Sequence, residues 1–257
     1  MLSDRLGDAQ MTEAVFGDDE EEGAPPARRL RPRVAREVVA ALARAIASSR
    51  FAERTTLPSE AALCAEFGVS RTVIREALKT LESKGLLRGK PRVGTLVRPK
   101  SDWNLLDAEL LDWMGADFLD DALLEAILEA RETVEPVAAE LAASRASPQE
   151  IADLHHAVAR MRTAGDHLAF TEADVVFHTV LLKASHNPVF AQFSAIIEAG
   201  LKRALGASNR AAGPGIEEAL AVHQQLVEAL RLRDKSAARA ASLAILERAR
   251  RDLPVAG

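Results

Sequence analysis

The residues from Ser70 to Leu78 set the strictest limit on what this chain can fold into. Ser70 is a favourable helix N-cap, because its hydroxyl can accept a hydrogen bond from a free amide of the first turn, so a helix is predicted to begin at Arg71. An apolar stripe then recurs at helical spacing, and basic and hydroxyl side chains follow the other face. The stripe consists of Val73, Ala77, Leu78 and Leu81, and the cationic face of Arg71, Thr72, Arg75 and Lys79.

The segments around this helix decide between a solvated surface helix and one that reads DNA. Upstream, residues 57–60 open a second helix, and Gly68 is placed to end it. The inner positions of that helix are Leu63, Cys64 and Phe67. Downstream, Gly85 stops the basic helix, and residues 86–88 and 95–97 are predicted to form two short strands. Helix, turn, helix and hairpin together predict a winged helix-turn-helix with a recognition helix from Arg71.

The charge of the chain is unevenly distributed. Residues 1–30 contain 3 basic and 8 acidic residues, residues 31–100 contain 15 and 6, and residues 101–257 contain 15 and 24. Only the middle part is basic, and it contains the predicted winged helix. A localised positive field suits a phosphate backbone, whereas the acidic remainder repels it. We therefore expect double-stranded operator DNA to bind residues 31–100.

Composition favours closely packed helices in an aqueous compartment. Aromatic residues make up only 4% of the chain and tyrosine is absent, while alanine and leucine are abundant. No run approaches the roughly 18 uncharged apolar residues of a membrane span, and the N-terminus is acidic where a signal peptide would be basic. The single cysteine, Cys64, excludes an intrachain disulfide and has the position of a small buried hydrophobe. The expected location is cytoplasmic, without a membrane partner.

The sequence pattern divides the chain into four parts. Residues 1–30 contain the acidic run 18–22 and are predicted to be a disordered acidic tail. Residues 31–100 are the winged helix-turn-helix, residues 101–118 a linker with a short helix, and residues 119–252 a helical effector-binding domain. The predicted helices of the last part cover residues 119–143, 148–163, 166–185, 188–206, 215–232 and 235–252. The fold class is therefore mainly α.

Two more helices complete this prediction. The first helix of the DNA-binding domain is expected from Arg33 to Ser48, where valine, leucine and isoleucine recur at helical spacing. After a break at residues 99–102, residues 103–114 are expected to form the short helix of the linker. Its Trp103 and Trp113 could hold the two domains together.

Three side chains in the predicted bundle have the chemistry of metal ligands. Asp174 and His178 are four residues apart, so they project from one face of a helix and could share a divalent ion. His223 lies on a later helix and could be a third ligand. A simple hydrogen bond on the helix surface explains the first pair equally well.

Arg131 lies near the interior boundary of the first long helix of the bundle, together with Glu132 and Glu135. A partly buried guanidinium is costly unless it is paired, and its fork suits a carboxylate. The partner could be an effector or an internal glutamate. A metal-dependent hydrolase is the enzymatic alternative. We disfavour it, because the sequence offers no separate general base, phosphate loop or nucleophile motif.

These motifs together resemble the GntR family of bacterial transcription regulators, in its FadR branch with an FCD effector domain. The DNA-binding motifs are residues 57–60, 68–71, 75–78, 85–86 and 94–95, and the FCD-like motifs are residues 131–143, 173–178, 185–190 and 222–230. Residues 101–114 and 187–205 are most similar to members of that branch that repress galactonate utilisation.

The resemblance implies a homodimeric repressor that releases its operator when a small carboxylate effector enters the bundle. DNA contacts are then expected from Ser59, Ser70, Arg71, Thr72, Arg75, Arg92 and Gly94. Effector contacts are expected from Arg131, Glu135, Asp174, His178, Asn187, Arg203 and His223. Within this second set, Asp174, His178 and His223 would hold a divalent metal such as zinc, and Arg131 would hold the effector's carboxylate.

Two positions depart from the family pattern. Ala61 stands where many relatives have an arginine, so one DNA contact is expected to be absent. Ile245 stands where metal-binding FCD domains usually have a further histidine on the last helix. Three protein ligands then remain, and if no metal binds, the two histidines would contact the effector's hydroxyl groups directly.

The function expected from the sequence is a dimeric, ligand-responsive repressor of a sugar-acid catabolic operon, with galactonate or a related aldonate as effector. The alternatives are the hydrolase fused to a DNA-binding module, and a structural nucleic-acid-binding protein without a ligand.

Overall fold

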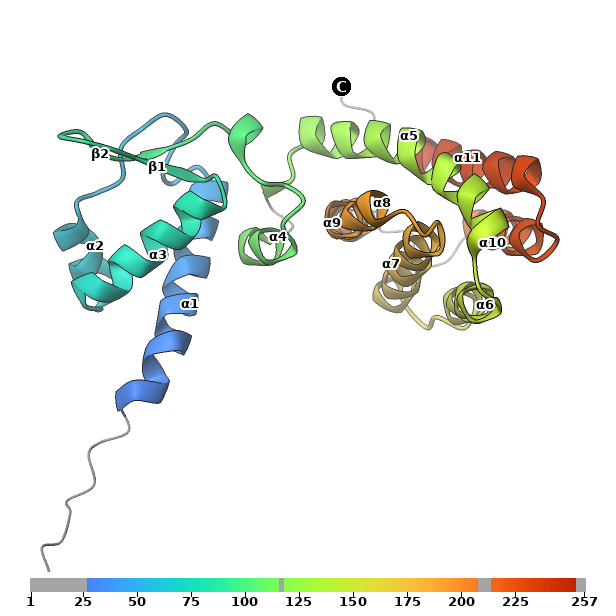
Figure 1. Cartoon of the computed structure of the whole chain (residues 1–257), viewed down its shortest axis with the longest axis horizontal. Coiled ribbons are helices and arrows are strands. Elements are labelled where there is room, and N and C mark those ends of the chain that lie inside the picture. Colours follow the sequence, from blue (N-terminus) through green and yellow to red (C-terminus); the bar gives the residue numbers. More distant parts are fainter. Residues whose placement is uncertain (1–26, 116–117, 208–213, 253–257) are drawn as a thin grey trace, which may run out of the picture.

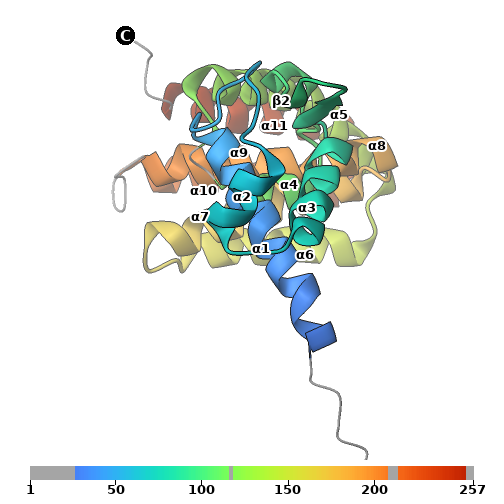
Figure 2. The same cartoon turned by 90° about the vertical axis from the view of Figure 1, so that its left-hand side faces the viewer.

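The computed structural model describes residues 27–115, 118–207 and 214–252. A group of helices with one β-hairpin lies at one end of the molecule, and a bundle of helices lies at the other (Figure 1). Viewed along this axis, the first group stands in front of the bundle (Figure 2). The predicted fold class, mainly α with an N-terminal winged helix-turn-helix and a C-terminal helical bundle, is confirmed.

The N-terminal group has the element order of a winged helix. Its members are α1 (Ala27–Ala47), α2 (Glu60–Phe67), α3 (Arg71–Ser83), β1 (Leu87–Lys90) and β2 (Gly94–Val97). Both α1 and α2 pack against α3. Helix α2 ends at Gly68, whose φ of +63° is left-handed, and α3 begins after Ser70, whose Oγ accepts a hydrogen bond from the amide of Val73. The predicted ends of these helices are confirmed.

The buried side of α3 differs slightly from the predicted stripe. Ile74, Ala77 and Leu81 are fully buried, whereas Val73 and Leu78 are only partly buried. Positions 74, 77, 78 and 81 are also at helical spacing, so the sequence pattern alone does not decide between the two stripes. Contact with α1 and α2 selects the one centred on Ile74.

The predicted tail is wrong at its last four residues. Helix α1 begins at Ala27, inside the range 1–30 that was expected to be disordered. Residues 27–30 are Ala, Arg, Arg and Leu, which all have high helix propensity, so they extend the helix predicted from Arg33. The rest of the predicted tail, including its acidic run, lies outside the described residues.

The wing is paired along both edges of its second strand. β1 and β2 are antiparallel, with Leu87 opposite Val97 and Lys90 opposite Gly94. On its other edge, β2 bonds to the segment before α2: Leu57 donates to the carbonyl of Thr95, and Val97 donates to the carbonyl of Thr55. The hairpin is therefore held firmly at its base, and its turn at residues 91–93 is exposed.

The linker contains a shorter helix than predicted. A single 3₁₀ turn, η1 (Lys100–Asp102), is followed by α4 (Ala108–Met114), so residues 103–107 are not helical. The carboxylate of Asp107 caps α4 by accepting from the amide of Leu110, which fixes the start of the helix there. Trp103 and Trp113 are buried, as expected for residues that join the two ends of the molecule.

Seven helices are described in the C-terminal bundle. They are α5 (Asp121–Arg145), α6 (Pro148–Arg162), α7 (His167–Ala184), α8 (Pro188–Gln192), α9 (Ser194–Ala207), α10 (Pro214–Arg231) and α11 (Lys235–Asp252). The predicted helix 188–206 is divided at Phe193, whose amide bonds to the carbonyl of Phe190, three residues back. No described helix is both long and apolar enough to cross a membrane.

The apolar core is arranged in two clusters. The first runs from α1 and α3 through Trp103 and α4 into α7 and α9, where Ile196 and Leu201 belong to it. The second lies among α5, α6, α7, α10 and α11 and includes Phe177, Leu226 and Ile245. Helix α7 contributes to both clusters. The few ionisable side chains that are buried in the bundle are therefore enclosed by apolar packing.

Candidate functional site

The outer face of α3 is exposed and basic. Arg71, Thr72, Arg75 and Lys79 are all exposed, and none of them lies in the core. Arg71 makes no ion pair with any described residue. Ser59 and Ser70 are also exposed, but each uses its hydroxyl as a helix cap, which leaves a lone pair and a proton for other partners. This face has the charge and accessibility that phosphate contacts require.

Arg75 is already paired on this face. Its Nε lies 2.9 and 3.1 Å from the two carboxylate oxygens of Glu60, the first residue of α2. Both side chains are accessible to solvent, so the pair is weak and can open. Arg92 and Gly94 lie on the wing, at and beside its exposed turn, where Arg92 has a left-handed φ of +65°. The DNA roles of these residues stay predictions.

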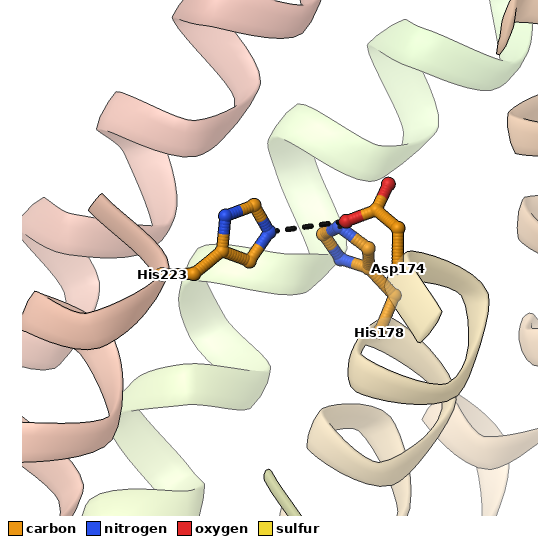
Figure 3. Close-up of side chains that lie close together, drawn as sticks. All are labelled: Asp174, His178 and His223. Carbon is orange, nitrogen blue, oxygen red and sulfur yellow. Dashed lines mark ion pairs between the residues drawn. The ribbon is translucent and has the colours of Figure 1, made fainter. Parts of the chain in front are cut away.

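Five charged or ionisable side chains form a buried cluster in the bundle, which we call the polar cluster. Arg131 and Glu135 come from α5, Asp174 and His178 from α7, and His223 from α10. All five are at most 7% exposed. In Figure 3, Asp174 and His178 project from α7 toward His223 on the facing helix. Packing of α5, α7 and α10 thus brings together groups that are up to 92 positions apart in the sequence.

His223 has its side chain fixed by its own helix. Its Nδ1 is 2.7 Å from the carbonyl oxygen of Ala219, which can only accept, so Nδ1 carries the hydrogen. In the neutral ring, Nε2 then has a lone pair. This Nε2 is 3.1 Å from Oδ1 of Asp174, yet neither atom has a hydrogen-bond partner among the described residues. Two buried acceptors that face each other in this way lack a positive group between them.

His178 is held by two neighbours on α5. Its Nδ1 is 2.7 Å from Oε2 of Glu135, and Oε1 of the same carboxylate accepts from Nε of Arg131 at 2.6 Å. Its Nε2 is 3.2 Å from Nη2 of Arg131 and 3.5 Å from Oδ1 of Asp174. Of the two partners that the sequence allowed for Arg131, the internal glutamate is the one observed.

The cluster strongly perturbs the ionisation of its members. Burial alone would raise the pKa of Glu135, but the charges of Arg131 and His178 outweigh it and lower this pKa to about 2. Burial likewise opposes the charge on Asp174, yet the charge of His178 holds the pKa of its carboxyl well below its usual range. For His178, burial and Arg131 act against protonation, but Glu135 and Asp174 prevail and raise the pKa to about 9. Such mutual shifts mark candidate functional sites.

The donor set of the cluster fits a divalent cation. Asp174, His178 and His223 each offer one ligand atom, and these atoms lie within 4.8 Å of one another. Carboxylate oxygen and imidazole nitrogen are ordinary ligands of zinc and similar metals. The hydrogen bonds from Nδ1 of both histidines leave their Nε2 atoms as the metal-facing donors. The unsatisfied Asp174 Oδ1 and His223 Nε2 support the same assignment.

Three other positions singled out in the sequence contribute no side chain to the polar cluster. Asn187 uses Oδ1 to cap α8 by accepting from the amides of Val189 and Phe190. Nε of Arg203 donates to the carbonyl of Leu119 at 3.3 Å. Ile245 is 5% exposed and packs in the second apolar cluster, so α11 contributes no ligand at this position. The effector roles of Asn187 and Arg203 remain predictions.

Two contributors were not expected from the sequence. Glu60 pairs with Arg75 across 15 positions, and no local pattern signals this contact. Phe177 packs beside both histidines: its ring centroid is 4.7 Å from that of His223 and 5.6 Å from that of His178, with edge-to-face geometry in both cases. Phe177 is three residues after Asp174 and therefore lies on the same face of α7. This spacing is the sequence signal that predicts its place beside the cluster.

Comparison with known proteins gives two family matches. Residues 34–97 match the family described as bacterial regulatory proteins, gntR family, and residues 126–248 match the FCD domain. The first range covers the winged helix, and the second contains every residue of the polar cluster.

Individual relatives agree with these matches. The chain is 33% identical over 217 residues to the galactonate operon transcriptional repressor of Escherichia coli, which covers 84% of this chain and 95% of that protein. It is 35% identical over 158 residues to YieP, an HTH-type transcriptional regulator of the same bacterium, covering 60% and 69%. The solved structure of Listeria monocytogenes Lar has the same fold, with a TM-score of 0.55 and 19% identity over 84% of this chain and 96% of that chain.

These relatives are transcription regulators and not enzymes, which removes the hydrolase alternative. A GntR winged helix implies DNA as a partner, and an FCD domain implies a small-molecule effector. The chain belongs to the GntR family of bacterial transcription regulators, with an FCD effector domain behind its winged helix.

Proposed function

We propose that this regulator is a homodimeric repressor of a sugar-acid catabolic operon, which releases its operator when an aldonate such as galactonate binds the polar cluster. In this proposal, residues 31–100 form the DNA-binding domain and residues 119–252 form the effector-binding domain. Residues 101–118 connect the two domains. The effector shifts the population toward a bundle arrangement in which the two winged helices no longer match the spacing of the half-sites.

The polar cluster is the observation that carries the effector part of this proposal. Burying several charges in an apolar bundle is costly, and a cluster that leaves two acceptors unsatisfied contributes little to stability in return. Such an arrangement is expected where a ligand supplies the missing interactions. Identity of 33% to a galactonate operon repressor along most of both chains makes aldonates the first ligands to test.

The ligand's chemistry follows from the groups that line the cluster. Asp174, His178 and His223 would hold a divalent cation, which supplies positive charge and coordination positions for a carboxylate and a neighbouring hydroxyl. Arg131 adds a second positive group beside them. An α-hydroxy acid offers both kinds of oxygen on adjacent carbons, whereas a neutral sugar lacks the carboxylate. Acidic sugars should therefore bind and neutral sugars should not.

The DNA part of the proposal uses the outer face of α3 and the wing. Arg71 is free to contact a base or phosphate, and Arg75 becomes free when it separates from Glu60. Thr72 and Ser70 can donate to phosphate oxygens at the start of the helix, and Arg92 lies on the wing, where a minor groove could receive it. Each winged helix of a dimer would read one half-site.

A thermal-shift screen followed by operator release tests this function. The purified protein is heated with D-galactonate, D-gluconate or D-glucuronate, each with Zn²⁺ and with a chelator, and D-galactose is the neutral control. Genomic fragments selected for binding then serve as operator in fluorescence anisotropy. We expect at least one aldonate, and not D-galactose, to raise the melting temperature and to release DNA.

Two results would count against the proposal. If no acidic sugar alters thermal stability or DNA affinity, the alternative of a nucleic-acid-binding structural protein is favoured. If sedimentation shows a monomer at the concentrations that bind DNA, the dimeric half-site mechanism is wrong even if the effector is correct.

A further inference from the structure

The hydroxyl of Ser242 on α11 is a buried polar group without a partner. Ser242 is 1% exposed, and its Oγ makes no hydrogen bond with any described residue. A serine or threonine inside a helix can donate to a carbonyl of the preceding turn, as Thr80 and Thr133 do. Oγ of Ser242 does not make this bond. Within the described ranges, the other buried side-chain atoms that lack a partner are Oδ1 of Asp174 and Nε2 of His223, both in the polar cluster.

The register of α11 against α10 places Ser242 level with the polar cluster. The two helices pack against each other and are joined by a short turn centred on Arg233. His223 is ten positions before this centre, and Ser242 is nine positions after it. The ion pair of Arg248 with Glu218, at 2.8 Å, has the same symmetry, because each of its members is fifteen positions from the centre. Ser242 is therefore at the height of His223 to within one residue.

The register of α11 against α5 gives the same level. Helix α11 runs alongside α5 (Figure 1), where Arg239 pairs with Glu140 and Arg250 pairs with Glu132. The two helices are thus antiparallel. Ser242, three residues after Arg239, comes level with α5 about one turn before Glu140, and the glutamate of the polar cluster lies within a further turn. Because the Ser242 side chain is buried and α11 packs against α5 and α10, it points toward these two helices.

Packing does not explain a hydroxyl at this position. The other buried residues of α11 are all apolar: Ala238, Ala241, Ile245 and Leu246. Ser242 is the single polar side chain on this face among the described residues of the helix. An unsatisfied hydroxyl here costs stability in the free protein, and a ligand that bonds to it would recover that cost.

We propose that Ser242 is a further effector contact, whose hydroxyl bonds to a hydroxyl group of the aldonate that neither the cation nor Arg131 engages. The cation takes the carboxylate and the neighbouring hydroxyl, so the hydroxyls farther along the chain need other partners. A serine hydroxyl both donates and accepts, which suits another hydroxyl. This inference rests on the proposed function and adds a basis for specificity: Ser242 favours long polyhydroxy acids over short hydroxy acids.

Calorimetric titration of wild type and Ser242→Ala tests the contact. Each protein is titrated, in the presence of Zn²⁺, with D-galactonate, D-gluconate and glycolate. Glycolate offers a carboxylate and the adjacent hydroxyl but no hydroxyl beyond them. We expect Ser242→Ala to bind each aldonate about three- to tenfold more weakly than wild type, as is typical for the loss of one neutral hydrogen bond. Its affinities for glycolate and for Zn²⁺ alone should not change.

Two controls separate this loss from a general effect on the protein. Ser236→Ala makes the same chemical change at an exposed position of α11 and should bind every ligand as wild type does. Thermal unfolding checks the fold of Ser242→Ala, which should be at least as stable as wild type because it lacks the unsatisfied hydroxyl.

The same titrations separate this inference from the proposed function. If Ser242→Ala binds aldonates as tightly as wild type, the hydroxyl has another role, such as holding a buried water, and the contact is wrong. An equal loss for glycolate would also overturn it, because Ser242 would then act on the end of the ligand that the cation holds. If wild type binds no aldonate, the proposed function fails and this contact fails with it.

Discussion

Lys84, the C-cap of α3, binds the side chain of Asp107, which caps α4. Its Nζ lies 2.9 and 2.8 Å from the two carboxylate oxygens, and a second carboxylate, that of Glu109, is also at 2.9 Å. The same ammonium group lies 5.2 Å from the ring centroid of Trp113. The end of α3 is therefore attached directly to the helix that leads into the bundle.

The ion pair of Lys84 and Asp107 should make stability depend on pH in a predictable direction. Burial would raise the pKa of Asp107, but the hydrogen bond and charge of Lys84 and the amide of Leu110 hold it below its ordinary 3.8. A lowered carboxyl pKa stabilises the fold above the unfolded value, and this contribution is lost as pH falls through the folded pKa. The pKa of Lys84 is raised above 10.5, despite burial, so its contribution persists until strongly alkaline pH.

The variant Asp107→Asn separates the contribution of the ion pair to stability from that of the helix cap. Asparagine caps as well as aspartate, so the bond to Leu110 is kept and only the ion pair is lost. We expect about 1 kcal/mol of destabilisation in urea unfolding at pH 7. The difference from wild type should shrink progressively as pH falls below 4, because the wild-type carboxyl takes up a proton first in the unfolded chain and, at lower pH, in the folded protein. A difference that stays constant down to pH 3 would contradict the assignment.

Gly85→Ala should destabilise the junction after α3. Gly85 has a left-handed φ of +85°, and a Cβ at this position would lie 2.6 Å from the carbonyl oxygen of Asp102. The backbone conformation alone costs about 1–2 kcal/mol for an alanine, and the contact adds to it, so at least about 2 kcal/mol should be lost. Gly89→Ala is the control, because a Cβ there meets only Glu82 Oε1 at 3.6 Å. Urea unfolding measures both.

Ser242→Ala should stabilise the protein. Ser242 is 1% exposed on α11, and its hydroxyl has no hydrogen-bond partner in the part of the chain that the structure describes. Removing an unsatisfied buried hydroxyl should gain about 1 kcal/mol in the free energy of unfolding. Ser185→Ala provides the contrast, since the equally buried hydroxyl of Ser185 donates to the carbonyl of Leu182 at 2.6 Å. That variant should lose stability instead.

Arg71→Ala should weaken DNA binding without affecting the bundle. If Arg71 contacts a base, the loss in operator affinity should be about 1–3 kcal/mol. Arg231→Ala removes the same charge from an exposed position on α10 and controls for the overall field of the protein. Fluorescence anisotropy with one operator fragment measures both variants. Unchanged affinity of Arg71→Ala would refute the role of this arginine.

Asp174→Asn should abolish stabilisation by metal. For the wild type, Zn²⁺ at 100 times its dissociation constant should add about 2.7 kcal/mol to the free energy of unfolding. The variant removes the only carboxylate among the three candidate ligands, so the added stability should largely disappear. Asp153→Asn, at an exposed position of α6, should retain it. An equal response of both variants would place the metal elsewhere.

Features that depend on neighbouring residues in the sequence were predicted well. The caps at Ser70 and Gly68 were correct, because a cap is a contact across three or four positions. The break at Phe193 was missed, since its residues have no strong helix-ending signal. The first residue of α1 was also misplaced, because composition alone marks the border between a charged tail and a charged helix poorly.

The candidate site was predicted in its members but not in its connections. Asp174 and His178 share a face through their spacing, and that much is local. The contact of His178 with Glu135 spans 43 positions and depends on how α5 packs against α7. For the same reason, the sequence left the partner of Arg131 open between a glutamate and an effector. Pairing in a buried cluster is a property of helix packing, which spacing along one helix cannot specify.

The apolar cluster that runs through α4 limits how this regulator can be recombined with others. The core of the DNA-binding end continues through Trp103 and Leu110 into Ile196 and Leu201 of α9, without an intervening polar layer. A chimaera that places this winged helix on another bundle would expose half of that cluster unless it also carries α4 and the facing side of α9. The exchangeable module is therefore larger than the winged helix, and it ends inside the effector domain.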